Sequence, residues 1–389
     1  MHGESILDTI FLIFTGGAIV AGLALFARQS MLIAYIALGV LVGPWGFALI
    51  EDATTAQGIG EVGIIFLLYL LGLNLHPQKL ARMMREATIV TLGSSLVFAA
   101  AGFGVALAFG FTTTESLVIG ALSMFSSTII GLKLLPTTTL HHRHTGEIVI
   151  SVLLLQDVIA IVALLGLDAM SRPNLSTGDA AWLAAALPVV VVAAAVMERW
   201  VLTPLIRRFD TIREYIFLAA IGWCLGIAQL GHAMGLSQEI GAFVAGVALA
   251  RSPVATFIAE SLKPLRDFFL VMFFFALGAA FPIPVLAEVA LPAVCLGGLM
   301  LVLKPVVFHW LLRREHESSR LSMEIGVRLG QLSEFSLLIA AIASQGKVIG
   351  PNAAYAIHAA TLLTFIVSSY LIMLRYPTPI AVTESLRRD

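Results

Sequence analysis

Apolar residues follow one another in long runs along this chain, and the short segments between the runs hold most of the charges. A helix needs about 20 predominantly apolar residues to cross the hydrocarbon core of a bilayer. Runs that approach this length lie at residues 6–25, 31–50, 58–75, 87–109, 115–134, 147–169, 179–200, 212–231, 237–250, 266–282, 286–311, 321–343 and 353–374. The pattern predicts an all-α polytopic membrane protein with 13 transmembrane helices.

The composition agrees with this pattern. The chain has 389 residues, of which 59% are hydrophobic and 12% are charged, and its mean hydropathy is +0.97. Soluble domains usually carry about 25% charged residues, so a soluble globular protein is excluded. The first run lacks a preceding basic segment and a small-residue cleavage site, which favours a retained span over a signal peptide.

The distribution of Lys and Arg predicts the orientation of the chain. With the N-terminus outside, the cytoplasmic segments hold 19 of the 23 Lys and Arg residues, and the outside segments hold only Arg172 and Lys347. The other two, Lys304 and Arg328, fall within spans. Because Lys and Arg concentrate on the cytoplasmic side of membrane proteins, we expect the N-terminus outside and the C-terminus in the cytoplasm. The expected location is the cell (inner) membrane of a bacterium.

Two pairs of motifs recur at one spacing, which indicates an internal repeat. Gly72 in "FLLYLLGLNL" and Gly278 in "VMFFFALGAAF" are 206 residues apart, and so are Ser127 in "MFSSTIIG" and Ser333 in "GQLSEFSL". The offset relates span 3 to span 10 and span 5 to span 12. Because these differ by an odd number of spans, the two halves point in opposite directions. We therefore predict inverted repeats, spans 1–6 and 8–13, of the kind found in secondary transporters.

Spans 5 and 12 also contain clusters of small polar residues at mid-membrane depth. Ser, Thr and Gly weaken a helix and can satisfy the backbone groups that a break sets free. Small residues of this kind also permit close helix packing. Interrupted helices at corresponding positions of two inverted halves are the best sequence indication of a transport site, so we expect two crossing broken helices here.

Ionisable residues within spans are costly and usually functional. Asp157 lies in the middle of "SVLLLQDVIAIVALLGL", Lys304 lies in span 11, and Arg328 and Glu334 lie in span 12. A charge at the bilayer centre costs roughly 2.5–3.5 kcal/mol on insertion scales, so we expect a function for Asp157. Lys304 and Glu334 fit either a functional role or a structural polar pair. Arg328 is expected to extend its guanidinium towards the cytoplasmic surface.

Helix dipoles suggest how these charges act together. Two crossing broken helices bring together two half-helix N-termini, which are partly positive, and two C-termini, which are partly negative. Glu334 would compensate the positive cluster and Lys304 the negative cluster. Asp157 then supplies the one exchangeable charge, for which a proton and a monovalent cation compete. Its neighbour Gln156 either ligates the cation through its carbonyl oxygen or orients a neighbouring helix.

Further motifs are "ALGVLVGP", "FLLYLLGLNLHPQKL", "SMFSSTIIGLKLL", "LLLQDVIAI", "IGAFVAGVALARS" and "LGQLSEFSLLIA". Through these motifs, the chain resembles the second monovalent cation:proton antiporter family over essentially its whole length. Within that family it resembles the Kef-type potassium efflux transporters. The Gln156–Asp157 pair is the most specific motif, since many sodium-transporting relatives have Asp-Asp or Asn-Asp there.

The resemblance implies a sodium/proton-antiporter-like fold with a core of six crossing helices and a dimerisation bundle. It also implies alternating access by an elevator movement. The ion site that it implies for K+ (or Na+) and H+ consists of Asp157 and the broken helices around Ser126, Ser127, Thr128 and Ser333.

The chain departs from the family in two places. Kef proteins continue after the last span into a cytosolic nucleotide-binding domain, whereas this sequence ends at "TESLRRD". We therefore expect an exchanger domain at 1–375 and a cytoplasmic tail at 376–389 without that regulatory domain. Kef proteins also carry an acidic stretch before span 10, where this chain has Lys263 and Arg266, so the resemblance does not extend gating by glutathione to this chain.

The expected partners are the lipid bilayer and a second copy of the chain. A separate nucleotide-binding regulatory domain or ancillary subunit is a further candidate, and neither nucleic acid nor a bound cofactor is expected. The run "HHRH", residues 141–144, lies in a cytoplasmic segment. It could sense pH near neutrality, bind a metal or simply form a solvated loop.

Taken together, the residues favour an electroneutral 1:1 cation/proton antiporter and not an enzyme, and the resemblance implies potassium as the cation. A sodium/proton antiporter of the same fold is the main alternative. A cation channel would need a continuous pore without proton coupling, and a receptor or scaffold would leave Asp157 and the broken helices without a role.

Overall fold

Helices dominate the part of the chain that the structure describes. The structure is a computed structural model that describes residues 6–27, 29–50, 54–74, 85–134, 144–170, 177–209, 212–250, 252 and 254–378. Within these ranges, seven helices are long and apolar enough to cross a membrane: Leu7–Phe26, Ala87–Ala108, His144–Leu167, Ala185–Arg208, Arg213–Ala233, Ile283–Arg314 and Pro351–Arg375. Shorter apolar helices are Met31–Val42, Val62–Leu73, Gln238–Leu249 and Glu334–Gln345.

Each of the predicted spans contains helical residues, so the all-α class is confirmed. The number of 13 crossings stays a prediction. Of the tail expected at 376–389, only residues up to 378 are among those described.

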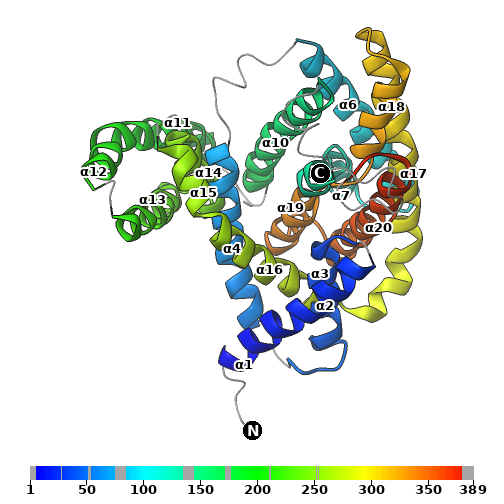
Figure 1. The fold of residues 1–389 in the computed structure, drawn as a ribbon, viewed down its shortest axis with the longest axis horizontal. Coiled ribbons are helices and arrows are strands. Elements are labelled where there is room, and N and C mark those ends of the chain that lie inside the picture. Colours follow the sequence, from blue (N-terminus) through cyan, green and yellow to red (C-terminus); the bar gives the residue numbers. More distant parts are fainter. Residues whose placement is uncertain are drawn as a thin grey trace. The chain divides into compact units, whose positions relative to one another are not determined.

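The chain forms two units, of which the first consists of Met1–Gly16, Leu38–Arg82 and Asp168–Ala280. Its helix α4 (Thr54–Asn74) packs against both α14 and α16. The other elements of this unit are α1 (Ile6–Phe11), α11 (Thr177–Met197), α12 (Thr203–Arg208), α13 (Arg213–Ala233), α14 (Gln238–Leu249), α15 (Ala255–Ser261) and α16 (Lys263–Ala279), with π-helical turns η1 (Leu12–Gly16) and η2 (Glu198–Leu202) (Figure 1).

Two close helix crossings in this unit repeat with the spacing found in the sequence. A Cβ atom on Gly72 of α4 would lie 3.1 Å from the Cα atom of Gly246 in α14. A Cβ atom on Gly39, near the end of α3 (Met31–Val42), would lie 3.0 Å from the Cα atom of Gly278 in α16. Gly72 and Gly278 are 206 residues apart, and Gly39 and Gly246 are 207 apart. The two crossings are therefore equivalent, as an inverted repeat requires.

The second unit consists of Gly17–Ala37, Met83–Leu167 and Phe281–Asp389. Within it α17 packs against α6, α18 and α20, while α7 packs against α6 and α19. Its elements are α2 (Gly17–Phe26), the first part of α3, α6 (Arg85–Ala108), α7 (Thr113–Ser123), α8 (Thr128–Lys133), α10 (His144–Met170), the 3-10 turn η3 (Ile283–Val285), α17 (Leu286–Arg314), α18 (Ser319–Arg328), α19 (Glu334–Gln345) and α20 (Pro351–Arg375) (Figure 1).

Predicted spans 5 and 12 are both interrupted. Residues 124–127 separate α7 from α8, and residues 329–333 separate α18 from α19. We refer to these segments as break one and break two. Both belong to the second unit, together with spans 4, 6, 11 and 13, and they position the site described below.

Candidate ion site at two helix breaks

The two breaks lie against each other. Ser126 Oγ in break one donates to the carbonyl oxygen of Leu329 in break two over 2.8 Å. Ser336 Oγ, in the first turn of α19, donates to the carbonyl oxygen of Leu122 near the end of α7 over 2.7 Å. Backbone groups that a break sets free need partners within the protein where water is excluded. Here each broken helix supplies partners for the other.

Ser127 and Ser333 directly precede the second half-helix of each pair. Ser127 Oγ accepts a hydrogen bond from Ile130 N–H over 3.0 Å, and Ser333 Oγ accepts one from Phe335 N–H over 3.1 Å. Serine is a preferred residue for capping a helix N-terminus in this way. The spacing of 206 therefore joins two equivalent caps. A further contact of these hydroxyl groups with an ion stays a prediction.

Gln156 on α10 holds the backbone of break one. Its Oε1 accepts from Ser126 N–H over 2.9 Å, and its Nε2 donates to the carbonyl oxygen of Met124 over 3.1 Å. Both polar atoms of the amide thus engage the break. Of the two roles open to Gln156, this arrangement favours orienting the neighbouring helix.

Asp157 follows on α10 and is only 4% exposed. Its carboxyl group interacts electrostatically with that of Glu334, the first residue of α19. Glu334 is also buried. The first turn of a helix favours negative charge, so α19 provides a suitable position for Glu334. The sequence predicted a role for both Asp157 and Glu334, but not that their carboxyl groups interact.

Lys304 on α17 is fully buried and connects the two breaks. Its ammonium group donates to the carbonyl oxygen of Phe125 in break one, to Ser126 Oγ over 3.3 Å, and to the carbonyl oxygen of Gln331 in break two over 3.0 Å. Compensation of the half-helix C-termini requires a position of this kind. The role itself stays a prediction.

Thr128 is the first residue of α8 and corresponds to Glu334 in the repeat, 206 residues away. Its Oγ1 atom is buried and makes no hydrogen bond to the residues that the structure describes. Buried polar atoms almost always have a partner. Among the hydroxyl groups predicted at the breaks, that of Thr128 is therefore the best candidate for a cation ligand.

Two buried polar residues were missed or misjudged in the sequence. Gln331 in break two donates through Nε2 to the carbonyl oxygen of Arg328 over 2.9 Å and accepts at Oε1 from Ser368 Oγ over 2.8 Å. The sequence feature that could have identified Gln331 is an amide side chain inside an apolar run.

The expectation that Arg328 reaches water is wrong, because its side chain is 1% exposed. It bonds instead to Glu324 and to the carbonyl oxygens of Leu134 and Pro377.

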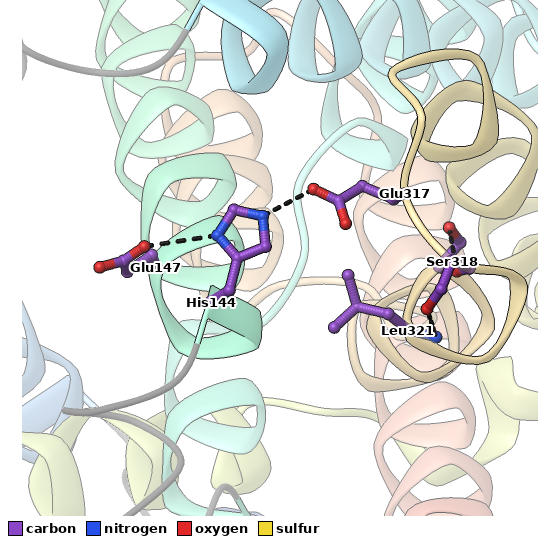
Figure 2. A network of polar contacts seen from close by, with 6 residues as sticks. His144, Glu147, Glu317, Ser318 and Leu321 are labelled. Atoms are coloured by element: carbon purple, nitrogen blue, oxygen red, sulfur yellow. Dashed lines mark hydrogen bonds and ion pairs between the residues drawn. The ribbon is translucent and has the colours of Figure 1, made fainter.

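A second polar cluster lies where α10 begins. The Nε2 atom of His144 lies 2.6 Å from Glu317 in the connection between α17 and α18, and its Nδ1 atom lies 3.4 Å from Glu147 (Figure 2). His144 is the last residue of the "HHRH" run, and residues 141–143 lie outside the described ranges. Within those ranges no group of three His, Cys, Asp or Glu side chains suits a metal ion.

Comparison with known proteins adds to this geometry. The family model described as "Sodium/hydrogen exchanger, transmembrane" matches residues 10–373, which is most of the chain. The chain belongs to this exchanger family. The predicted resemblance to cation:proton antiporters is thereby confirmed.

The Kef-type resemblance is also found among curated relatives of this exchanger. This chain is 29% identical over 372 residues to the glutathione-regulated potassium-efflux system protein KefC of Enterobacter sp. (strain 638). The matched region covers 93% of this chain and 59% of that protein. It is 27% identical over 383 residues to the protein of the same name from Escherichia coli O6:K15:H31, covering 97% and 62%. The chain spans about three-fifths of the length of these relatives.

Among solved structures, the exchanger resembles the sodium proton antiporter MjNhaP1 from Methanocaldococcus jannaschii at pH 8. The TM-score is 0.67 at 16% identity, and the match covers 94% of this chain and 98% of that chain. At this identity the likeness concerns the fold alone, and it confirms the predicted antiporter-like fold.

Proposed function

We propose that this exchanger is a cation:proton antiporter that exchanges potassium for protons, with Asp157 binding the two ions alternately. The observation that carries the proposal is the buried carboxyl group of Asp157, which interacts with Glu334 at the end of break two and follows Gln156, which binds break one. A buried acid is tolerated when it is protonated, and it needs a compensating cation when it is not. Proton and cation therefore exclude each other at Asp157.

The surroundings of Asp157 support a site for a monovalent cation. Protein oxygen atoms can replace the hydration shell of such an ion. Candidate ligands are the Asp157 carboxylate, with which Glu334 interacts, and the buried Thr128 hydroxyl at the start of α8. Gln156 and the serines of the breaks serve mainly to hold the backbone in place, and Lys304 compensates the half-helix C-termini.

The likeness to KefC proteins supports potassium as the cation, and the Gln156–Asp157 pair agrees with it. A sodium/proton antiporter remains the alternative, because the fold is shared with the sodium proton antiporter MjNhaP1. The proposal includes an elevator movement of the second unit, which carries the ion site. It also includes a homodimer in a bacterial inner membrane with the N-terminus outside, and regulation by a nucleotide-binding domain or ancillary subunit.

Ion flux in proteoliposomes tests the proposal. The purified protein is reconstituted, and proton movement is followed while gradients of potassium, sodium, rubidium or lithium are imposed. We expect proton flux coupled to the potassium gradient and its loss in Asp157→Asn. The matched control is Asp267→Asn, an exposed acid on α16, which should behave like the parent. Cation-coupled proton flux that persists in Asp157→Asn would remove Asp157 from the mechanism, and cation flux without proton flux would contradict antiport.

A further inference from the structure

Break two contains a backbone N–H group that corresponds to one already described in break one. Ser126 N–H in break one is bound by Gln156 from α10. The residue 206 positions further along is Leu332 in break two. Its N–H donates over 3.0 Å to Oγ1 of Thr364 on α20. The same position of each break is thus held by a side chain from the span that follows it.

The hydroxyl group of Thr364 is oriented for this task. It donates its own hydrogen to the carbonyl oxygen of Thr361 over 2.8 Å, one turn back on the same helix, so a lone pair remains for Leu332 N–H. Thr364 is fully buried. A buried backbone N–H group that lost this acceptor would be left without a partner, and break two would have to shift to find another.

A second side chain of α20 holds the same break one turn further along. Ser368 Oγ donates over 2.8 Å to Oε1 of Gln331, whose Nε2 binds the carbonyl oxygen of Arg328 over 2.9 Å. The carbonyl oxygen of Gln331 in turn accepts from Lys304. Ser368 and Gln331 are both buried. One face of α20 therefore fixes the main chain on which Lys304 and α19 depend.

We propose that Thr364 and Ser368 are positioning residues of the ion site, through which α20 fixes break two as Gln156 fixes break one. They act on the ion through the backbone of break two and the first turn of α19, where Glu334 lies near Asp157. The inference rests on the proposed function. It assigns to the last span a part in setting cation affinity rather than in binding the ion.

The test compares variants that differ by single hydroxyl groups in the proteoliposome assay. Thr364→Val keeps the shape of the side chain and removes the acceptor, and Ser368→Ala removes the donor to Gln331. Thr364→Ser keeps a hydroxyl group and serves as the rescue. The matched control is Ser369→Ala, a buried serine next to Ser368 on the same helix.

The expected result is a change in cation affinity with little change in maximal rate. Loss of one buried hydrogen bond typically changes an equilibrium by roughly three- to tenfold, so we expect the apparent KM for potassium to rise by this factor in Thr364→Val and Ser368→Ala. Thr364→Ser and Ser369→Ala should keep the parent value. A purely structural role would lower the amount of folded protein and the rate, and leave the KM unchanged.

The outcomes separate this inference from the proposed function. If the parent exchanges ions and both Thr364→Val and Ser368→Ala keep its KM, the positioning role is wrong and the antiporter stands. If Thr364→Val fails to fold, the KM of Ser368→Ala decides. A parent that shows no cation-coupled proton flux would instead contradict the proposed function itself.

Discussion

At the scale of single residues, Lys304 has a hydrogen-bond acceptor for each hydrogen of its ammonium group. An ammonium group has three hydrogens, and Lys304 has three acceptors, two of which are main-chain carbonyl oxygens, one in each break. The third acceptor, Ser126 Oγ, passes its own hydrogen to break two. Lys304 therefore fastens the breaks to each other and to α17.

Removal of Lys304 or Glu334 should lower stability at least as much as transport. Lys304→Ala leaves two carbonyl oxygens and a hydroxyl group without their donor, and Glu334→Ala leaves the start of α19 uncompensated. Breaking a buried charge arrangement typically costs roughly 3–5 kcal/mol. Thermal unfolding in detergent measures the loss, with Lys347→Ala as an exposed control. Variants that melt like the parent but do not transport would make these residues part of the ion site.

Individual residues differ in how far the sequence could predict them. An acid in an apolar run, such as Asp157, can be recognised as functional from the sequence, because a charged side chain within the bilayer has a high free-energy cost. The contacts that join the two breaks cannot be predicted in this way, because Ser126 and Leu329 are 203 residues apart in sequence and meet only through the fold. Arg328 was misjudged for the same reason: its distant carbonyl partners, Leu134 and Pro377, cannot be inferred from spacing.

At the scale of elements, helix interruptions and close crossings were predictable where small residues gather. Ser127 and Ser333 both cap a second half-helix, so the motif repeat in the sequence corresponds to a structural one. The glycine repeat corresponds to the crossings of α4 with α14 and of α3 with α16.

Gly72→Ala should destabilise the first unit. The added methyl group would lie 2.4 Å from the carbonyl oxygen of Phe243 and 2.9 Å from the backbone nitrogen of Val247, so α4 and α14 would have to separate. Overpacking of this kind typically costs about 1–3 kcal/mol. The control is Gly222→Ala on α13, where nothing lies within 4 Å of the new methyl group. Thermal unfolding should show a lower midpoint for Gly72→Ala only, and equal midpoints would contradict the close crossing.

The contact between His144 and Glu317 should contribute more stability in mild acid than in mild alkali. A doubly protonated imidazole ring can donate to Glu147 and Glu317 at once, whereas a neutral ring can donate to only one of them. The contribution is therefore fully present below the pKa of the ring in the unfolded chain, near 6.5, and it is lost at higher pH as the ring of the folded protein deprotonates. Because His144 is 45% exposed, solvent screening limits the coupling to about 0.2–1 kcal/mol.

A double-mutant cycle of thermal unfolding measures this coupling. His144→Gln and Glu317→Gln are combined at pH 5.5 and pH 8, and Glu147→Gln provides the matched control, since that contact is longer and more exposed. Arg313 also faces this turn, with Nη1 bound to the carbonyl oxygen of Glu317, and it is kept unchanged in every variant. A coupling of equal size at both pH values would contradict the role given to the imidazole ring.

At the scale of the whole molecule, fold and family followed from patterns that span the chain. The apolar runs, the charge bias and the offset of 206 each involve many residues, so no single error overturns them. The choice of transported cation depends instead on a few oxygen atoms at one site. The same fold in MjNhaP1 at 16% identity does not decide that choice, which makes the comparison of cations in the flux assay informative.

Stoichiometry is the property of the whole transport cycle that the site constrains most directly. We expect one proton to exchange for one cation, so that no net charge moves. The residue beside Asp157 is Gln156, which cannot ionise and whose amide is bound to break one. Lys304 donates to Phe125, Ser126 and Gln331, an arrangement that does not require it to release a proton when a cation reaches Asp157. We therefore expect Asp157 to be the group that alternates between proton and cation.

Glu334 is the group that could add a second proton, because its carboxyl group interacts with that of Asp157. Recordings on solid-supported membranes distinguish the two cases. Electroneutral exchange gives proton flux in proteoliposomes without a sustained current under a potassium gradient. A sustained current that scales with proton flux and vanishes in Asp157→Asn would rule out electroneutral exchange. If that current vanished while proton flux persisted in Glu334→Gln, which keeps the size of the side chain and fixes it uncharged, the second proton would be assigned to Glu334.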